Sequence, residues 1–201
     1  MLPFLSSTLQ REFHTLAHRY GEPRLYTVDV GANGYVATRK RTAEVCMVVQ
    51  APQARVFTMT KEFYPPGCYR LPTGGIRRHE RVLVALQRES LEEFGQALVV
   101  RRFLAAVAYR RDAAPPTFHT FAFLLDASEE PPRPRDRHER ITGFRPIQVD
   151  ELPRVADTLD GLPVSPSADV DVPWRDWGRF RAVIHRVVWE TLTASGAGRS
   201  E

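Results

Sequence analysis

Residues 74–95 read GGIRRHERVLVALQRESLEEFG, and this stretch decides how the rest of the chain is interpreted. Among its glycine and charged residues are Gly74, Glu80, Arg88, Glu89, Glu92, Glu93 and Gly95. The apolar residues between them predict a helix that starts near His79 and runs to about Phe94. Gly95 would end that helix, because glycine tolerates the left-handed conformation. The sequence therefore predicts a glycine-containing loop followed by an acidic helix.

Three carboxylates share one face of this predicted helix. Glu89, Glu92 and Glu93 are spaced i, i+3 and i+4, which places them side by side. Carboxylates so close repel one another unless a positive charge lies among them, and Arg88 and Mg²⁺ are the two candidates. The alternative is an exposed acidic face with ordinary arginine–glutamate pairs. The glycines and Glu80 at their intervals favour a metal site.

The whole pattern resembles the signature of the Nudix hydrolases, G-x5-E-x7-R-E-U-x-E-E-x-G-U, in which U is a bulky apolar residue. All of its fixed positions are filled, whereas Ser90 and Gln96 stand where an apolar residue is expected. The preceding residues 61–72 look like the family's run into its metal loop, with Thr73 in place of the more usual glycine. The resemblance covers about residues 43–160. It implies an α/β fold, the Nudix-type α/β/α sandwich with a mixed β-sheet.

The resemblance also implies a chemistry. We expect a Mg²⁺-dependent hydrolase, with Mn²⁺ as a substitute, that cleaves the pyrophosphate linkage of a nucleoside diphosphate derivative. A nucleotide sugar, an ADP-ribose-like compound and a nucleoside triphosphate are the open alternatives for the substrate. Arg88 would orient a carboxylate through a charge-assisted bond, and Glu80 would support the metal shell. The implied metal ligands are Glu89, Glu92 and Glu93, with the backbone carbonyl of Thr73 or Gly74 added.

Two other classes of function compete with the enzyme. One is a non-catalytic Nudix-fold domain that senses or binds a nucleotide, and the intact carboxylate face argues against it. The other is a nucleic-acid binder, which the net charge of +4 is too small to support. The arginine-rich loop also lacks the interleaved aromatic residues that such binders use. We therefore expect a small-molecule nucleotide as the partner and no nucleic acid.

A further carboxylate is expected outside the motif. Many Nudix enzymes draw one from a loop just before the strand that leads into the last helix, and Glu139 holds that place after the Pro-rich segment 128–137. It could bind metal or act as general base on a water. The competing residues for this role are Asp136, Glu129 and Glu130, and the alternative is an exposed loop glutamate. The candidate catalytic residues are thus Arg88, Glu89, Glu92, Glu93 and Glu139.

Three arginines flank the predicted metal loop and could meet substrate phosphate, namely Arg77, Arg78 and Arg81. The alternative is a solvated start of the helix. We interpret His119, which alternates with apolar residues, as a structural histidine. Trp174, Trp177 and Trp189 are spaced as the core side of a helix.

Composition limits the remaining possibilities. Of the 28 basic residues only Lys40 and Lys61 are lysine. Arginine suits bidentate contacts to phosphate, although a high-GC genome explains the bias as well. Cys46 and Cys68 are expected to be buried, reduced thiols. No stretch of eighteen apolar residues occurs, so we expect a cytoplasmic protein without membrane contact.

The rest of the chain predicts three regions: an N-terminal helix and hairpin extension over 1–42, the Nudix core over 43–160, and a linker, C-terminal helix and tail over 161–201. Helices are expected at 6–20, 79–94, 149–159 and 174–192. Strands are expected at 25–30, 35–38, 44–49, 55–60, 68–71, 98–109, 117–125 and 140–147, with Asn33-Gly34 turning the first hairpin. Such an extension builds a homodimer interface or a substrate wall in some relatives, whereas we favour simple packing against the sheet.

Overall fold

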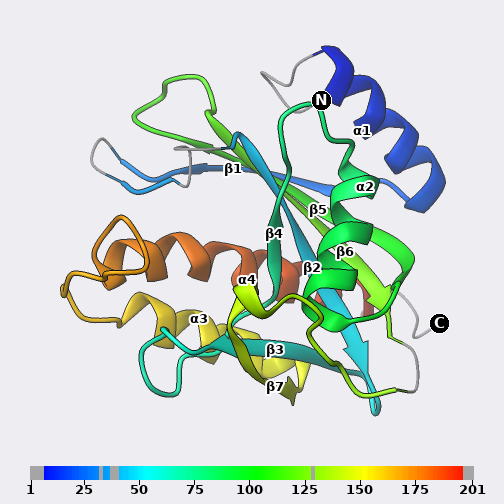
Figure 1. Ribbon diagram of the computed structural model, residues 1–201. Coiled ribbons are helices and arrows are strands. Elements are labelled where there is room, and N and C mark those ends of the chain that lie inside the picture. The colour runs from blue at the N-terminus through cyan, green and yellow to red at the C-terminus, as the bar shows by residue number, and fades with distance from the viewer. Residues whose placement is uncertain (1–6, 32–33, 37–40, 128–129, 197–201) are drawn as a thin grey trace.

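The computed structural model describes residues 7–31, 34–36, 41–127 and 130–196. These residues form a mixed β-sheet with helices on both faces, which confirms the expected sandwich (Figure 1). The strands are β1 Arg24–Asp29, β2 Ala43–Ala51, β3 Arg55–Lys61, β4 Thr73–Gly75, β5 Val99–Arg110, β6 Phe118–Asp126 and β7 Ile141–Ile147. Within the described residues the strand order is β1-β5-β6-β2-β3-β7, and β4 pairs separately with β2.

Strand β2 lies inside the sheet because its sequence, AEVCMVVQA, is apolar almost throughout and both of its faces are covered. It pairs parallel with β6 and antiparallel with β3 and β4. The ladder with β3 joins Gln50 to Val56 and Ala51 to Arg55, near the turn between the two strands. The ladder with β4 lies at the other end of β2, over residues 44–46. Strands β3 and β4 thus pair with opposite ends of β2 and separate from one another. The candidate site forms where they separate.

Two hydrophobic cores fill the two sides of the sheet. Helices α1 Ser7–Tyr20 and α2 Val82–Glu89 cover one side, and α3 Leu152–Asp160 and α4 Trp174–Gly196 cover the other (Figure 1). Alternate residues of β2 serve each core: Val45, Met47 and Val49 face α1 and α2, whereas Cys46 and Val48 face α3 and α4. The shorter helical turns are η1 Ser90–Phe94, η2 Arg137–Glu139 and η3 Val149–Glu151.

The N-terminal segment departs from the expected hairpin. The first helix is confirmed, but β1 pairs in parallel with β5, and Tyr35 and Val36 are not in a strand. Asn33 and the rest of the expected second strand lie outside the described residues. The long strand β5 offers β1 a six-residue ladder, and Tyr26 and Val28 pack onto the core there. Within the described residues, β1 therefore pairs with β5, and neither Tyr35 nor Val36 pairs with it.

Two boundaries near the motif also differ from expectation. The expected strand over residues 68–71 is wrong, because Arg70 forms a single bridge with Met59 and the strand β4 begins later, at Thr73. Helix α2 begins at Val82 and not near His79, whose φ of 63° is left-handed. The Val82 N–H donates to a carboxylate oxygen of Glu12 in α1 at 2.9 Å. A side chain distant in sequence thus fixes where the acidic helix starts.

The helix ends as expected, at Gly95 with φ 76°, but its last residues take a π-helical turn over Ser90–Phe94. Ser90 is buried where the signature expects an apolar residue, and its hydroxyl donates to the Leu86 carbonyl at 2.7 Å. The π-helical turn displaces Glu92 and Glu93 from α-helical positions. Turns of this kind occur often at functional sites.

The C-terminal elements and the two thiols match expectation. Trp174 and Trp177 are buried, and Trp189 packs partly buried against the same core. Cys46 and Cys68 are buried free thiols. In the part of the chain that the structure describes, no helix is both long and apolar enough to cross a membrane.

Candidate functional site

Carboxylates from two separate segments meet at the end of α2. One carboxylate oxygen from each of Glu89, Glu92 and Glu139 lies within 4.8 Å of the others. Glu89 closes α2, Glu92 lies in the π-helical turn, and Glu139 lies in η2 just before β7. The structure therefore brings Glu139 to the motif, as its position in the sequence suggested. With Glu93, these residues form what we call the carboxylate cluster.

Arg88 lies among these carboxylates and holds them in place. Its Nε and Nη2 donate to the two carboxylate oxygens of Glu80 at 2.8 and 2.9 Å. Its Nη1 donates to Glu89 at 2.6 Å and to Glu92 at 2.8 Å. Nη2 also donates to the Gly75 carbonyl at 2.8 Å. Because a guanidinium is planar, this set of bonds fixes Gly75, Glu80 and two cluster carboxylates relative to one another.

Glu80 closes the loop that precedes the helix. One of its oxygens accepts the Arg77 N–H at 2.8 Å, in addition to the bond from Arg88. These bonds lower the pKa of the Glu80 carboxyl, and the largest cause is the bond from Arg88. Glu80 is thus an ionised carboxylate that holds Arg88 and the loop beside the cluster, and it is not a member of the cluster.

Gly74 lies directly against Glu89. A Cβ added at position 74 would lie 2.0 Å from Cγ and 2.1 Å from Cδ of Glu89, so only glycine fits there. The ladder bonds from Met47 N–H to the Pro72 carbonyl and from Ile76 N–H to the Ala43 carbonyl flank this position. Antiparallel alternation then turns the Gly74 carbonyl toward β2 and the Thr73 carbonyl away from β2. Of the two expected carbonyl ligands, Thr73 has the suitable orientation.

Glu93 is the deepest carboxylate of the cluster, with 1 % of its surface exposed. Neither of its oxygens has a hydrogen-bond partner among the described residues. Burial raises the pKa of Glu93 to about 8, although Lys61 and Arg70 oppose the rise. Burial also raises the pKa of Glu89 above its usual value. Ionised forms of these two groups need additional positive charge nearby.

Lys61, at the end of β3, is a site residue that sequence reasoning missed. Its ammonium group donates to Glu139 and lies 3.6 Å from a carboxylate oxygen of Glu93. It therefore links the segment before β7 to the π-helical turn. The only signal in the sequence was its rarity, since Lys40 and Lys61 are the two lysines of the chain.

The residues of the cluster fit a hard divalent cation. All donors are carboxylate oxygens, to which the Thr73 carbonyl adds a neutral oxygen, and such donors suit Mg²⁺. The buried Glu93 oxygens without hydrogen-bond donors are the observation that supports this fit. Carboxylates that protein donors already satisfied would gain less from a cation.

The three flanking arginines take different places. Arg77 is 67 % exposed in its side chain and lies 3.6 Å from Glu92, at the rim of the cluster. Arg78 is exposed in the turn before α2. Arg81 lies 3.8 Å from Glu12 and so faces α1. Of the three, Arg77 has contact with a cluster carboxylate.

The alternatives to Glu139 lie elsewhere. Asp136 accepts the His138 N–H and caps η2, and Glu130 is exposed in the Pro-rich segment. Glu129 lies outside the described residues. His119 is buried in β6 next to Phe121, in keeping with a structural histidine.

A second group of buried charges surrounds the side chain of Thr73. Arg181 of α4 donates through Nη1 to both oxygens of Glu44, at 2.8 and 2.9 Å, and to the Thr73 hydroxyl at 3.0 Å. Arg70 donates to the same hydroxyl at 3.0 Å. These groups, with His185, form what we call the α4 network. Two arginines from distant segments thus fix the side chain of Thr73.

His185 connects α4 to the backbone of the loop. Its Nε2 accepts the Leu71 N–H at 2.8 Å, and its Nδ1 lies 2.8 Å from the Arg181 carbonyl. The two contacts require a neutral ring with the proton on Nδ1. Burial lowers the pKa of His185 to about 3, which agrees with this state.

Comparison with known proteins identifies the family. The model of the NUDIX domain matches residues 40–165. No curated protein matches significantly. The ORF135 protein of E. coli has a similar solution structure, with 16% identity, coverage of 83% of this chain and 99% of that one, and a TM-score of 0.50.

Two further solved structures are a MutT Nudix hydrolase from Burkholderia pseudomallei and a Nudix hydrolase from Nitrosomonas europaea. Each is 19% identical to this chain. They cover 77% and 80% of this chain and 99% and 91% of their own, with TM-scores of 0.45 and 0.46. The match to the family model extends over more than half of the chain. The chain therefore belongs to the Nudix family of hydrolases, which act on pyrophosphate bonds.

Proposed function

We propose that the chain is a Mg²⁺-dependent hydrolase of nucleoside diphosphate derivatives, with Mn²⁺ as a substitute ion. The observation that carries the proposal is the convergence of Glu89, Glu92 and Glu139 within 4.8 Å beside the buried carboxylate of Glu93. In this proposal Glu89, Glu92, Glu93 and the Thr73 carbonyl hold the ion. A cytoplasmic location belongs to the same proposal and is supported by the free, buried thiols.

The protein's own groups would mainly position the reactants, since phosphoryl-type transfer needs little covalent help. The bound ion would neutralise charge on the phosphate oxygens and lower the pKa of a coordinated water. Arg88 keeps Glu89 and Glu92 at fixed positions, so that little reorganisation is needed when substrate arrives. Arg77 offers a guanidinium to phosphate at the rim.

We assign Glu139 the removal of the proton from the attacking water. Lys61 donates to its Oε2, which leaves Oε1 for that proton. The side chain is 26% exposed, so water can reach it. Its position before β7, on a different segment from the ligands in the π-helical turn, supports this division of roles.

The test is a screen of purified protein with Mg²⁺ against a panel of nucleotides, with phosphate measured after a coupled phosphatase. We expect turnover of at least one nucleoside diphosphate derivative and its loss with EDTA. Glu139→Gln should lower kcat, with a loss that shrinks as pH rises because hydroxide replaces the base. Glu130→Gln, an exposed carboxylate in the neighbouring loop, is the matched control. Tight nucleotide binding without turnover across the panel would favour the sensor alternative.

A further inference from the structure

The C-terminal helix α4 reaches the strand that carries the proposed carbonyl ligand, although the family model ends before this helix. The model matches residues 40–165, whereas α4 lies beyond that range. On α4, Arg181 and His185 are spaced i, i+4 and so lie one turn apart on the same face. His185 accepts the Leu71 N–H at 2.8 Å, and Arg181 donates to the Thr73 hydroxyl at 3.0 Å. Successive turns of α4 thus bind two positions at and just before the start of β4.

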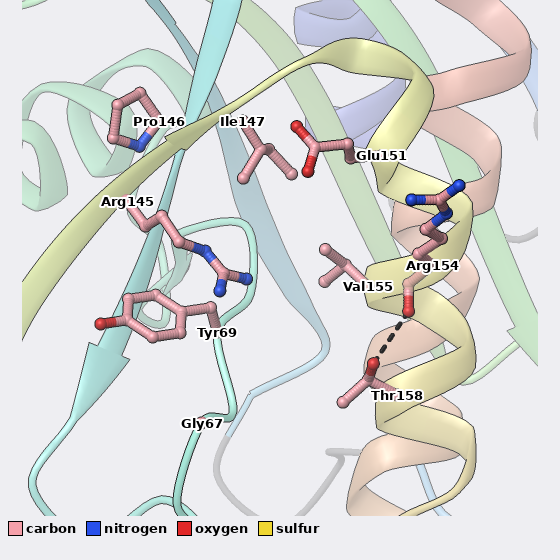
Figure 2. A pocket seen from close by; sticks show the side chains of 9 residues that line it. All are labelled: Gly67, Tyr69, Arg145, Pro146, Ile147, Glu151, Arg154, Val155 and Thr158. Atoms are coloured by element: carbon pink, nitrogen blue, oxygen red, sulfur yellow. Dashed lines mark hydrogen bonds between the residues drawn. The ribbon is translucent and has the colours of Figure 1, made fainter.

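Helix α3 lies on the same side of the sheet as α4, next to a pocket of about 300 Å³ between α3 and strand β7 (Figure 2). Figure 2 shows the guanidiniums of Arg145 and Arg154 pointing in different directions, so they do not converge on one group. Ile147 and Val155, which line this pocket, belong to the core under α3 and α4, whereas Glu89 lies in α2 on the other side. The contacts that link this side of the sheet to β4 therefore come from α4.

Thr73 is held both by its backbone and by its side chain. Its backbone pairs with β2. Its buried hydroxyl accepts hydrogen bonds from Arg181 and from Arg70, each at 3.0 Å. Because side chains alternate along a strand, the Thr73 side chain faces α4, and position 74 faces α2, where an added Cβ would meet Glu89. Thr73 thus joins the α4 network to the residue that packs on the carboxylate cluster.

Other groups hold the two guanidiniums in place. Arg70 donates through Nε to the Tyr64 hydroxyl at 2.7 Å. Arg181 donates through Nη1 to both oxygens of Glu44, at 2.8 and 2.9 Å. Both arginines are buried. The Thr73 hydroxyl is therefore bonded to two groups whose own positions are fixed.

We propose that the Thr73 hydroxyl is a positioning group for the metal site. Arg70 and Arg181 hold it, so that the Thr73 carbonyl keeps the orientation in which it binds a divalent ion. The same contacts keep Gly74 against Glu89. The inference rests on the metal site of the proposed function. Loss of a group that orients a metal ligand typically weakens metal binding by about 10- to 100-fold. Helix α4 is thereby part of the metal site of this chain, although it lies outside the matched domain.

Mn²⁺ binding in the absence of substrate tests this role. The electron paramagnetic resonance signal of free Mn²⁺ gives the Kd of each variant. Thr73→Val removes the hydroxyl, keeps the shape of the side chain and should raise the Kd roughly tenfold. Thr73→Ser keeps the hydroxyl and should leave the Kd close to that of the wild type. Thr73→Gly also lacks the hydroxyl but places no methyl group beside the guanidiniums. It should weaken binding as well, and it replaces Thr73→Val if that variant does not fold.

Thr58→Val is the matched control. The Thr58 hydroxyl is buried in β3 and donates to the Arg145 carbonyl at 2.8 Å, outside the metal site. We expect urea denaturation in EDTA to show a loss of stability for both Thr58→Val and Thr73→Val, because each removes a buried hydroxyl from its partners. Only Thr73→Val should weaken Mn²⁺ binding. A purely structural role of Thr73 would lower stability and leave its Kd unchanged.

The activity assay separates failure of this inference from failure of the proposed function. If the wild type hydrolyses nucleotides while Thr73→Val and Thr73→Gly bind Mn²⁺ as tightly as the wild type, the positioning role is wrong and the function stands. If Mn²⁺ binding depends on the hydroxyl but no nucleotide is hydrolysed, the role stands and the function is wrong. Equal weakening of Mn²⁺ binding in Thr73→Ser and Thr73→Val, or in Thr58→Val and Thr73→Val, would also overturn the role. A wild type that does not bind Mn²⁺ would overturn both.

Discussion

The α4 network and the carboxylate cluster are buried groups of charges that meet at neighbouring residues of β4, Thr73 and Gly74. They differ in whether their buried carboxylates accept hydrogen bonds from the protein. In the α4 network both oxygens of Glu44 accept hydrogen bonds, from Arg181 and from Thr120. In the carboxylate cluster neither oxygen of Glu93 accepts one among the described residues. The two carboxyls are buried to the same extent, at 1 % exposure each.

The pKa shifts follow from this difference. Burial raises the pKa of both carboxyls, but Arg181 and Arg41 outweigh burial at Glu44, and its pKa falls below the usual value. At Glu93 burial prevails, and the pKa rises to about 8. A carboxylate that protein cations satisfy stabilises the fold. One that they leave unsatisfied costs stability and can be retained because a ligand satisfies it.

Breaking the α4 network should have the largest effect. Arg181→Met leaves the Glu44 carboxylate buried without its main partner, which typically costs about 3–5 kcal/mol of unfolding free energy. Urea denaturation followed by circular dichroism measures this loss. The double variant Arg181→Met/Glu44→Gln should recover part of it, because the buried charge is then gone. A double variant no more stable than the single one would show that Arg181 acts through packing alone.

The same kind of change in the carboxylate cluster should act on turnover and not on stability. Glu93→Gln should lower kcat by about 10² or more, because it removes a ligand charge, which corresponds to about 2.7 kcal/mol. In the absence of divalent ions its unfolding free energy should stay equal or rise, since a buried charge is lost. The checks are kcat on the best substrate and urea denaturation in EDTA. A stable variant with the wild-type rate would contradict the metal assignment.

The same comparison shows which parts of the molecule the sequence could predict. The cluster was largely predictable, because Glu89, Glu92 and Glu93 lie within five residues on one turn of chain. Glu139 was found from its place before the last strand alone. A prediction from such local spacing holds even though the turn is π-helical and not α-helical, because Glu92 and Glu93 still point to the same side of the helix as Glu89.

The α4 network was not predictable, because its partners are far apart in the chain. Glu44 and Arg181 are separated by 137 positions, and Leu71 and His185 by 114. The predicted start of α2 was wrong for the same reason. Glu12, which accepts the Val82 N–H, is 70 positions away in the sequence. The parallel ladder between β1 and β5 likewise joins residues far apart in the chain, such as Arg24 and Ala105, and the sequence did not indicate it.

Metal ions should stabilise the folded state through the carboxylate cluster. Binding to the folded form alone adds RT ln(1+[L]/Kd), about 1.4 kcal/mol when Mg²⁺ is ten times its Kd. For a chain of this size we expect the melting temperature to rise by about 3–5 °C. Glu92→Gln should shrink the rise, and Glu130→Gln should not. The contrast between the two regions would fail if Glu44→Gln reduced the metal-dependent rise as much as Glu92→Gln.

The smallest expected effect is on the pH dependence of the unfolding free energy, which differs between the two regions. His185 has a folded-state pKa of about 3, below its ordinary value of 6.5, so the unfolded chain takes up the proton first as pH falls. The contribution of His185 to stability is therefore almost complete at pH 7.5 and declines as pH falls through 6.5, by about 0.8 kcal/mol between pH 7.5 and 6.0. Glu93 has a raised pKa and gives the opposite slope, because the folded state binds its proton first.

In the wild type the pH dependences of stability from His185 and Glu93 offset one another. The effect of His185 should therefore be measured in the Glu93→Gln variant without divalent ions. Urea denaturation of that variant at pH 7.5 and 6.0 should show the loss of stability. Adding His185→Gln should flatten the dependence, since glutamine has no proton to gain and can still accept the Leu71 N–H. The loss of stability expected from Glu44 lies below about pH 4.5, outside this window, because its pKa is lowered in the folded state. An unchanged slope after His185→Gln would mean that another titrating group carries the pH dependence.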